Sequence, residues 1–193
     1  MLWLLEELCV KYQLVRYCRG ADHRAPPDLA RVHPLGKSPV IVDGGLVLAE
    51  SASILRYVEG RYEKGGLTPP YMTRDHAVRD EWLDYVESSA ALPIMVTLLG
   101  GLMGGLSVAM KAFAAPQVTR TIDYIAQGLG DKPFLMGGSL MLADIQMSYV
   151  LGLAQRIGAL DASPVVARYF EQLQTQPAFT RAVGKGGSMM MPA

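Results

Sequence analysis

The apolar residues of this chain change their period near residue 65, and this change limits the folds open to it. Upstream, segments with helical spacing alternate with short apolar runs typical of strands, whereas downstream the strand patterns stop. The sequence therefore predicts a small α/β unit followed by an all-helical unit. We expect an α/β domain over 1–64, a linker rich in Gly and Pro over 65–72, a helical domain over 73–184 and a loose tail over 185–193.

Within the first unit, the strand pattern SPVIV is followed by Asp43-Gly44-Gly45 and a second apolar run, LVLA, which indicates a tight hairpin. The other elements expected there are a helix over 2–12, a strand at QLVRY (13–17), a short helix opened by Pro26-Pro27-Asp28, and the helix SASILRYVEGRY. The helices expected downstream cover 73–99, 108–129, 142–157, 164–174 and 178–183.

Composition excludes several classes of protein. With 18 basic and 18 acidic residues, the chain has no charge excess that favours nucleic acid or an anionic membrane. Two cysteines, Cys9 and Cys18, are too few for a disulfide framework, so we expect a reducing, cytoplasmic compartment. We expect both side chains to be buried and to fill space in the core, without a catalytic role. Glu6 and Glu7 interrupt the apolar N-terminus, which has no basic start and does not resemble a signal peptide.

The segment from Ser88 to Met110 carries no charged residue and is long and apolar enough to span a membrane. Pro93, two Gly-Gly pairs and the lack of a basic flank before Lys111 favour a buried helix that ends in a glycine-rich turn. We therefore expect no membrane association, and a membrane-associated helical protein is the third interpretation of the chain.

The stretch GKSPVIVDGGLVLAESASILRY suggests a binding site for a short peptide. Pro39 cannot donate a ladder hydrogen bond, so it belongs at the first residue of a strand, and a cis Ser38–Pro39 bond would leave the Ser38 backbone facing outward. Ser51 is a favoured N-cap type at the start of a helix, where unpaired N–H groups attract a carboxylate. Glu50 could take an ammonium group. Together these features suit a peptide with an amino-acid head group.

Over nearly its whole length the chain resembles a glutathione S-transferase, and WLDYVESSAALP is similar to a bacterial and fungal subgroup of that family. LWLLEELCVKYQLVRY resembles the family's first helix and second strand, and HPLGKSPVIVDGGLVLAESASILRYV its tripeptide site. FLMGGSLMLADI resembles the family's folding motif, and QPAFTRAV its closing segment. All five segments occur in the family's order.

This resemblance implies a thioredoxin-like first domain, a helical second domain and a detoxifying reaction in which glutathione attacks a hydrophobic electrophile. It also implies a cytoplasmic homodimer that uses glutathione as co-substrate and no metal. Ser38, before the cis Pro39, would pair its backbone with the cysteinyl part of glutathione. Glu50 and Ser51 would hold the γ-glutamyl head, and Lys37 would reach the glycyl carboxylate. The alternatives are a plain helix cap for Ser51 and solvated charges for Glu50 and Lys37.

The helical domain would supply the wall for the electrophile, with Tyr85, Ser88 and Ser89 as candidates; residues on such a helix also serve as core or dimer contacts. The three histidines, His23, His33 and His76, are scattered, so we expect no metal site.

Two departures from the family pattern affect the predicted activity. Met141 stands three residues before Asp144, where the family has Ser or Thr, and the lost cap is worth about 1 kcal/mol. The chain as given starts inside the first helix, so the first strand and the catalytic loop are expected to be missing and the catalytic residue is unknown. A conjugating enzyme and a non-catalytic glutathione-binding or scaffold protein both remain open, and we expect little conjugation by the 193-residue chain.

Overall fold

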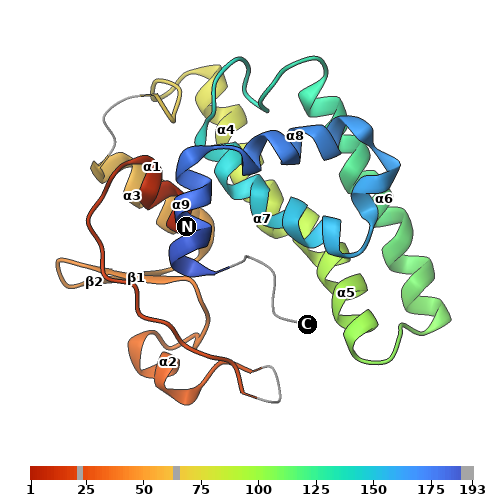
Figure 1. Ribbon diagram of the computed structural model, residues 1–193, viewed down its shortest axis with the longest axis horizontal. Coiled ribbons are helices and arrows are strands. Elements are labelled where there is room, and N and C mark those ends of the chain that lie inside the picture. The colour runs from red at the N-terminus through yellow and green to blue at the C-terminus, as the bar shows by residue number, and fades with distance from the viewer. Residues whose placement is uncertain (21–23, 63–65, 188–193) are drawn as a thin grey trace.

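The computed structural model describes residues 1–20, 24–62 and 66–187 (Figure 1). Its first part contains α1 (Leu2–Glu7), α2 (Pro27–Val32), β1 (Val40–Asp43), β2 (Leu46–Ala49) and α3 (Ser51–Tyr62). The helical part contains α4 (Arg74–Tyr85), the π-helical turn η1 (Val86–Ala90), α5 (Ala91–Leu102), α6 (Val108–Leu129), α7 (Leu142–Arg156), the 3-10 turn η2 (Ala159–Ala162), α8 (Pro164–Gln174) and α9 (Pro177–Gly186). The predicted order, an α/β part followed by helices, is confirmed.

Strands β1 and β2 form the predicted antiparallel hairpin. The register runs from Val40 opposite Ala49 to Asp43 opposite Leu46. The turn residues Gly44 and Gly45 have φ of 55° and 88°, which glycine adopts without steric cost and which match the twist of a two-residue hairpin.

The predicted strand at 13–17 is absent, and this expectation was wrong. Among the described residues β1 pairs only with β2, and no ladder reaches residues 13–17. A strand without a partner leaves its N–H and C=O groups to water, so this segment runs as irregular chain with Val15 61% exposed.

Helix α1 is also shorter than predicted. It ends at Glu7, and Cys9 adopts the left-handed conformation with φ of 53°, which stops the helix before residue 12. Both Cys9 and Cys18 are exposed, so the expectation of buried thiols was wrong as well.

Helix α7 lies at the centre of the helical part, and most of its 15 residues are buried against α3, α4, α5 and α8 (Figure 1). The first and last helices also pack together, with the rings of Trp3 and Phe179 edge to face at 5.1 Å. One hydrophobic core therefore joins the first part of the chain to the helical part.

The predicted helices over 108–129 and 164–174 agree with α6 and α8 residue for residue. The predicted helix over 73–99 continues to Leu102 but changes to π-helical hydrogen bonding at Val86–Ala90. Helix α9 extends to Gly186, into the predicted loose tail, whose residues 188–193 lie outside the described part of the chain.

The stretch Arg74–Leu102 is long and apolar enough to cross a membrane by length and composition alone, and 33% of its most apolar portion is buried inside the protein. The prediction of a buried helix therefore holds for one face of this stretch only.

Candidate functional site

The hairpin brings the two halves of the predicted peptide site together. The Ser38–Pro39 bond is cis, as predicted, and it immediately precedes β1. Because Val40 pairs with Ala49, Pro39 and Glu50 flank the same end of the hairpin. Ser38 is exposed there, as is Lys37 one residue earlier.

Glu50 has an unusual backbone at the start of α3. Its φ is 70°, a left-handed conformation that costs a residue other than glycine about 1 kcal/mol or more. Its carbonyl accepts the first helical bond from the Ile54 N–H at 2.9 Å, so Glu50 occupies the cap position. Ser51 is the first helical residue and not the N-cap, which corrects the prediction. The hydroxyl of Ser51 thus lies beside the open N–H groups of the first turn.

A groove runs between the start of α3 and the π-helical turn. It is lined by Glu50, Ala52, Ser53, Arg56, Asp84, Glu87 and Ser88. The groove therefore joins one predicted head-group residue, Glu50, to one predicted electrophile residue, Ser88. Lys37, Ser38, Pro39 and Ser51 flank its hairpin end without being among its lining residues.

The groove carries more negative than positive charge. Arg56 donates to Asp80 at 2.9 Å and to Asp84 at 2.7 Å. Burial disfavours the charged guanidinium, but the hydrogen bonds to Asp84 and Asp80 outweigh it and raise the pKa of Arg56. Arg56, the one cation among the lining residues, is thus paired with Asp80 and Asp84, and the carboxylates of Glu50 and Glu87 line the same groove. The groove is thus suited to a positively charged group.

Tyr85 faces away from this groove. Its ring lies 5.7 Å from that of Trp82 and 4.8 Å from that of Tyr124 on α6. Burial raises the pKa of Tyr85 and keeps its phenol neutral. Ser88 and Ser89 are exposed on the π-helical turn, with their hydroxyls 3.4 Å apart, and only Ser88 lines the groove.

Sequence reasoning missed three charged residues of the groove, Arg56, Asp84 and Glu87, and Asp80, which pairs with Arg56. The spacing of the three acids is that of one helix face and could have indicated them. The π-helical turn, which widens α4 at Glu87–Ser89, has no comparable sequence signal, although such turns are frequent at functional sites.

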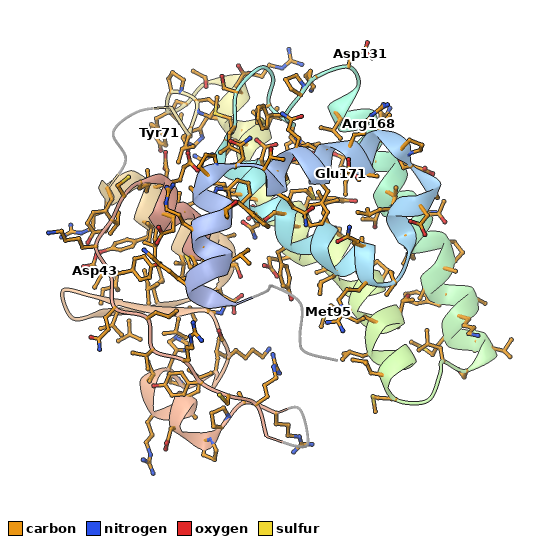
Figure 2. The ribbon with its side chains drawn as sticks, in the orientation of Figure 1. Asp43, Tyr71, Met95, Asp131, Arg168 and Glu171 are labelled. Carbon is orange, nitrogen blue, oxygen red and sulfur yellow. The ribbon has the colours of Figure 1, made fainter. Side chains whose placement is uncertain are left out.

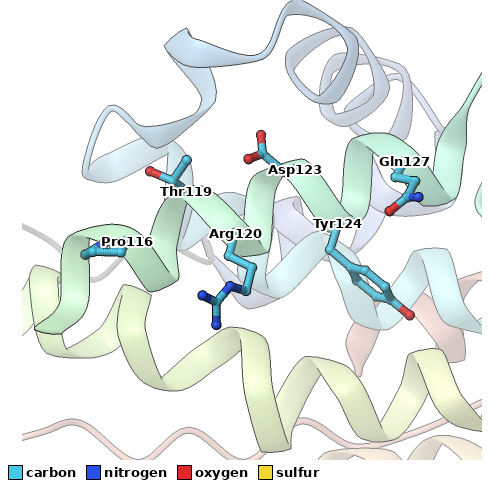
Figure 3. Close-up of a pocket in the computed structure, with 6 residues that line it drawn as sticks. All are labelled: Pro116, Thr119, Arg120, Asp123, Tyr124 and Gln127. Carbon is cyan, nitrogen blue, oxygen red and sulfur yellow. The ribbon is translucent and has the colours of Figure 1, made fainter.

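A second hollow lies along α6 (Figure 3). It is lined by Pro116, Thr119, Arg120, Asp123, Tyr124 and Gln127. All six come from one helix, and none is a predicted site residue. The groove beside α3 is therefore the better candidate.

The described residues contain no group of three or more His, Cys, Asp or Glu side chains placed to hold a metal ion. His23 lies outside the described residues. The His76 ring lies 2.6 Å from an Arg79 nitrogen and 3.6 Å from an Asp80 oxygen.

Comparison with known proteins places this geometry in a family. Residues 1–60 match the family described as "Glutathione S-transferase, N-terminal domain". Glutathione S-transferase 4 of Zea mays is 31% identical over 90% of this chain and 81% of its own. Glutathione S-transferase 1 of Saccharomyces cerevisiae is 27% identical over 98% of this chain and 91% of its own.

Solved structures agree with these relatives. The crystal structure of a glutathione S-transferase from Actinobacillus pleuropneumoniae superposes with a TM-score of 0.84 and 31% identity, covering 95% of this chain and 85% of that one. The chain belongs to the glutathione S-transferase family. Its first part is the thioredoxin-like domain of that fold and its second part the helical domain, as predicted.

Proposed function

We propose that this protein binds glutathione in the groove between the hairpin end and the π-helical turn, and transfers it to a hydrophobic electrophile. The observation that carries the proposal is the conformation of Glu50, which places a free carboxylate and the open start of α3 at one point. An amino-acid head group needs an anion site and a cation site side by side, and this point supplies both.

The α-carboxylate of the γ-glutamyl group is the ligand for the start of α3. The first-turn N–H groups of this 12-residue helix have no intrahelical acceptors, and the positive end of the helix dipole adds to their attraction. The Ser51 hydroxyl lies in the same turn and donates a further hydrogen bond.

The ammonium group of the same residue is the ligand for Glu50, with Glu87 on the opposite wall of the groove. The cysteinyl part then pairs with the exposed backbone of Ser38 before Pro39, and Lys37 reaches the glycyl carboxylate. This arrangement extends the tripeptide along the hairpin end.

The electrophile would lie against the π-helical turn, at Ser88 and Ser89, whereas Tyr85 packs against Trp82 and Tyr124 and faces away from the groove. The glutathione sulfur attacks the electrophilic carbon as a thiolate, an S–C bond forms, and the leaving group departs with its electron pair. A free thiol has a pKa of about 8.5, so the enzyme must favour the thiolate as well as hold both reactants. Glutathione is the co-substrate, and a cytoplasmic homodimer is part of this proposal.

A second candidate is a glutathione-binding protein without transferase activity. One feature of the groove favours this candidate. Ser53 and Ser88 supply the hydroxyl groups of the lining, and neither hydroxyl pairs with a base among the described residues. Binding and conjugation assays on the same preparation separate the two candidates.

Calorimetry with glutathione tests the binding site. Ser51→Ala should weaken binding by about 1–3 kcal/mol, the cost of leaving a polar partner unsatisfied. Ser139→Ala, an exposed serine between α6 and α7, is the matched control and should bind like the wild type. Equal affinities for wild type and Ser51→Ala would show that the hydroxyl does not contact the ligand.

A ligand change tests the role of Glu50. Glu50→Gln should weaken binding of glutathione but leave unchanged the weaker binding of an analogue that lacks the γ-glutamyl ammonium. An equal loss for both ligands would contradict the assignment of Glu50 to that ammonium.

A further inference from the structure

The helical hairpin formed by α5 and α6 exposes apolar side chains at its tip. Met103 is 83% exposed and Val108 is 87% exposed, on either side of the turn at Gly104-Gly105. The tip lies at an outer end of the molecule, at the lower right of Figure 1. Other exposed large apolar residues near this turn are Leu99, Leu102, Met110 and Phe113. We call these six residues the hairpin tip.

The charged residues in this part of the sequence are all positive. No Asp or Glu occurs between Glu87 and Asp123, and the charged residues in this interval are Lys111 and Arg120. Lys111 is exposed, and no ion pair or hydrogen bond of its side chain is found among the described residues. An apolar tip with a free lysine, in a hairpin segment without acids, complements a surface whose interior is apolar and whose outer layer is anionic.

We propose that the hairpin tip is a peripheral docking site for an anionic lipid bilayer. Met103 and Val108 enter the boundary between headgroups and acyl chains, and Lys111 extends its charge to the headgroups. Methionine is unbranched and flexible, which suits a disordered lipid environment. The proposal goes beyond the glutathione site and does not rest on it.

The packing of α5 limits the contact to the bilayer surface. Ile94 and Leu98, earlier in α5 than the hairpin tip, form a face that is buried in the core shared with α7. A transmembrane arrangement would have to pull this face out of the core. A lipid surface also fits the tip better than a second protein copy, because a stable dimer buries roughly 800 Å² per partner, and a convex turn cannot offer a broad self-complementary patch.

Vesicle co-sedimentation tests this proposal with the whole chain. Wild-type protein should bind vesicles of phosphatidylcholine with about 30% phosphatidylserine more tightly than vesicles of phosphatidylcholine alone. The double variant Met103→Ser/Val108→Ser should bind the anionic vesicles at least about tenfold more weakly, since both side chains lose their contact with the acyl region. Lys111→Gln should reduce binding to anionic vesicles about fivefold and leave binding to neutral vesicles unchanged.

The matched control is Tyr71→Ser/Met72→Ser. These two residues are 80% and 81% exposed, and Figure 2 shows Tyr71 on the side of the molecule away from the hairpin tip. This variant should bind vesicles like the wild type, and all variants should retain wild-type circular dichroism.

Three outcomes would overturn the proposal. Wild-type protein that stays in the supernatant with both kinds of vesicle rules out lipid docking. Equal binding by the Met103→Ser/Val108→Ser variant places any lipid contact elsewhere. A mass in sedimentation equilibrium that falls from dimer to monomer in that variant, with no vesicle binding by the wild type, assigns the hairpin tip to a second copy of the chain.

Discussion

Helix α7 and the β1–β2 hairpin have opposite relations to the core. Most of the 15 residues of α7 are buried, whereas Ala49 is the one buried residue of the two four-residue strands. A helix satisfies its own backbone groups, so it needs only side-chain packing around it. A strand depends on a neighbouring strand for its backbone hydrogen bonds, and β1 has one such neighbour among the described residues. Side-chain packing therefore determines the structure of the helical part, and backbone hydrogen bonds between strands determine the structure of the hairpin.

The same contrast appears in two aspartates, one in each region. The buried Asp144 carboxylate accepts hydrogen bonds from the Leu135 N–H at 2.9 Å, the Met141 N–H at 2.8 Å and the Tyr169 hydroxyl at 2.6 Å. Burial outweighs these bonds and raises the pKa of Asp144.

Asp43, labelled in Figure 2, lies at the end of β1. It also accepts hydrogen bonds from hydroxyls, at 2.7 Å from Tyr62 and 2.8 Å from Tyr57. Those bonds, with Arg61 beside them, lower the pKa of Asp43. Similar partners have opposite consequences because only Asp144 is removed from water.

The largest predicted effect concerns Asp144. Asp144→Ala should lower the free energy of unfolding by about 3–5 kcal/mol, because it leaves three buried donors without an acceptor. Urea denaturation measures this loss, and Asp131→Ala, an exposed aspartate labelled in Figure 2, serves as the control with an expected change near zero. A loss below about 1 kcal/mol for Asp144→Ala would mean that hydrogen bonds of buried polar groups do not account for the difference between the helical part and the hairpin.

A smaller effect is predicted where α1 meets α9. Glu6 is 6% exposed and accepts hydrogen bonds from Lys185 at 2.6 Å, Tyr12 at 2.6 Å and Arg181 at 3.3 Å. The bonds from Lys185 and Tyr12, in that order, hold the pKa of Glu6 below its ordinary value. Glu6→Gln should cost about 1–3 kcal/mol at neutral pH.

The pH dependence of this cost has a definite sign. Because the folded pKa of Glu6 is depressed, its contribution is present above the ordinary pKa of a glutamate, about 4.3, and is lost as the pH falls through the folded value. The difference between wild type and Glu6→Gln in urea denaturation should therefore shrink below about pH 4. Glu171→Gln, at an exposed glutamate, is the control variant. A difference that stays constant to pH 3 would contradict the role of the ionised carboxylate.

The two regions also differ in how far the sequence predicts them. Helices α6 and α8 could be placed residue for residue, because their caps and periods are local: Ser107 accepts from the Met110 N–H at 3.3 Å, and Pro164 opens α8. The strand expected at 13–17 depends on a distant partner, and no local pattern shows whether that partner is present. Met141 does lack a side-chain cap bond, as predicted, while Asp144 supplies the reciprocal one.

The candidate site was predictable in part for the same reason. Pro39 and Glu50 could be brought together because the Asp43-Gly44-Gly45 turn fixes the hairpin register. The opposite wall, formed by Asp84 of α4 and Glu87 of the π-helical turn, could not be predicted, because the packing angle between α3 and α4 and the π-helical turn depend on the whole core.

The smallest predicted effect is a matched pair that isolates one hydrogen bond in each region. Tyr169→Phe removes a buried hydroxyl from Asp144, and we expect a loss of about 1–2 kcal/mol in the free energy of unfolding, because no water can take the vacated position. Tyr57→Phe removes the corresponding bond to Asp43, where Tyr62 and Arg61 remain and solvent has access, so the loss should be clearly smaller. Both variants keep the aromatic ring, and urea denaturation of the two in parallel compares the regions directly. Equal losses of unfolding free energy would show that burial does not determine the strength of these hydrogen bonds. A larger loss for Tyr57→Phe would reverse the comparison and identify the contact between the hairpin and α3 as the more sensitive one.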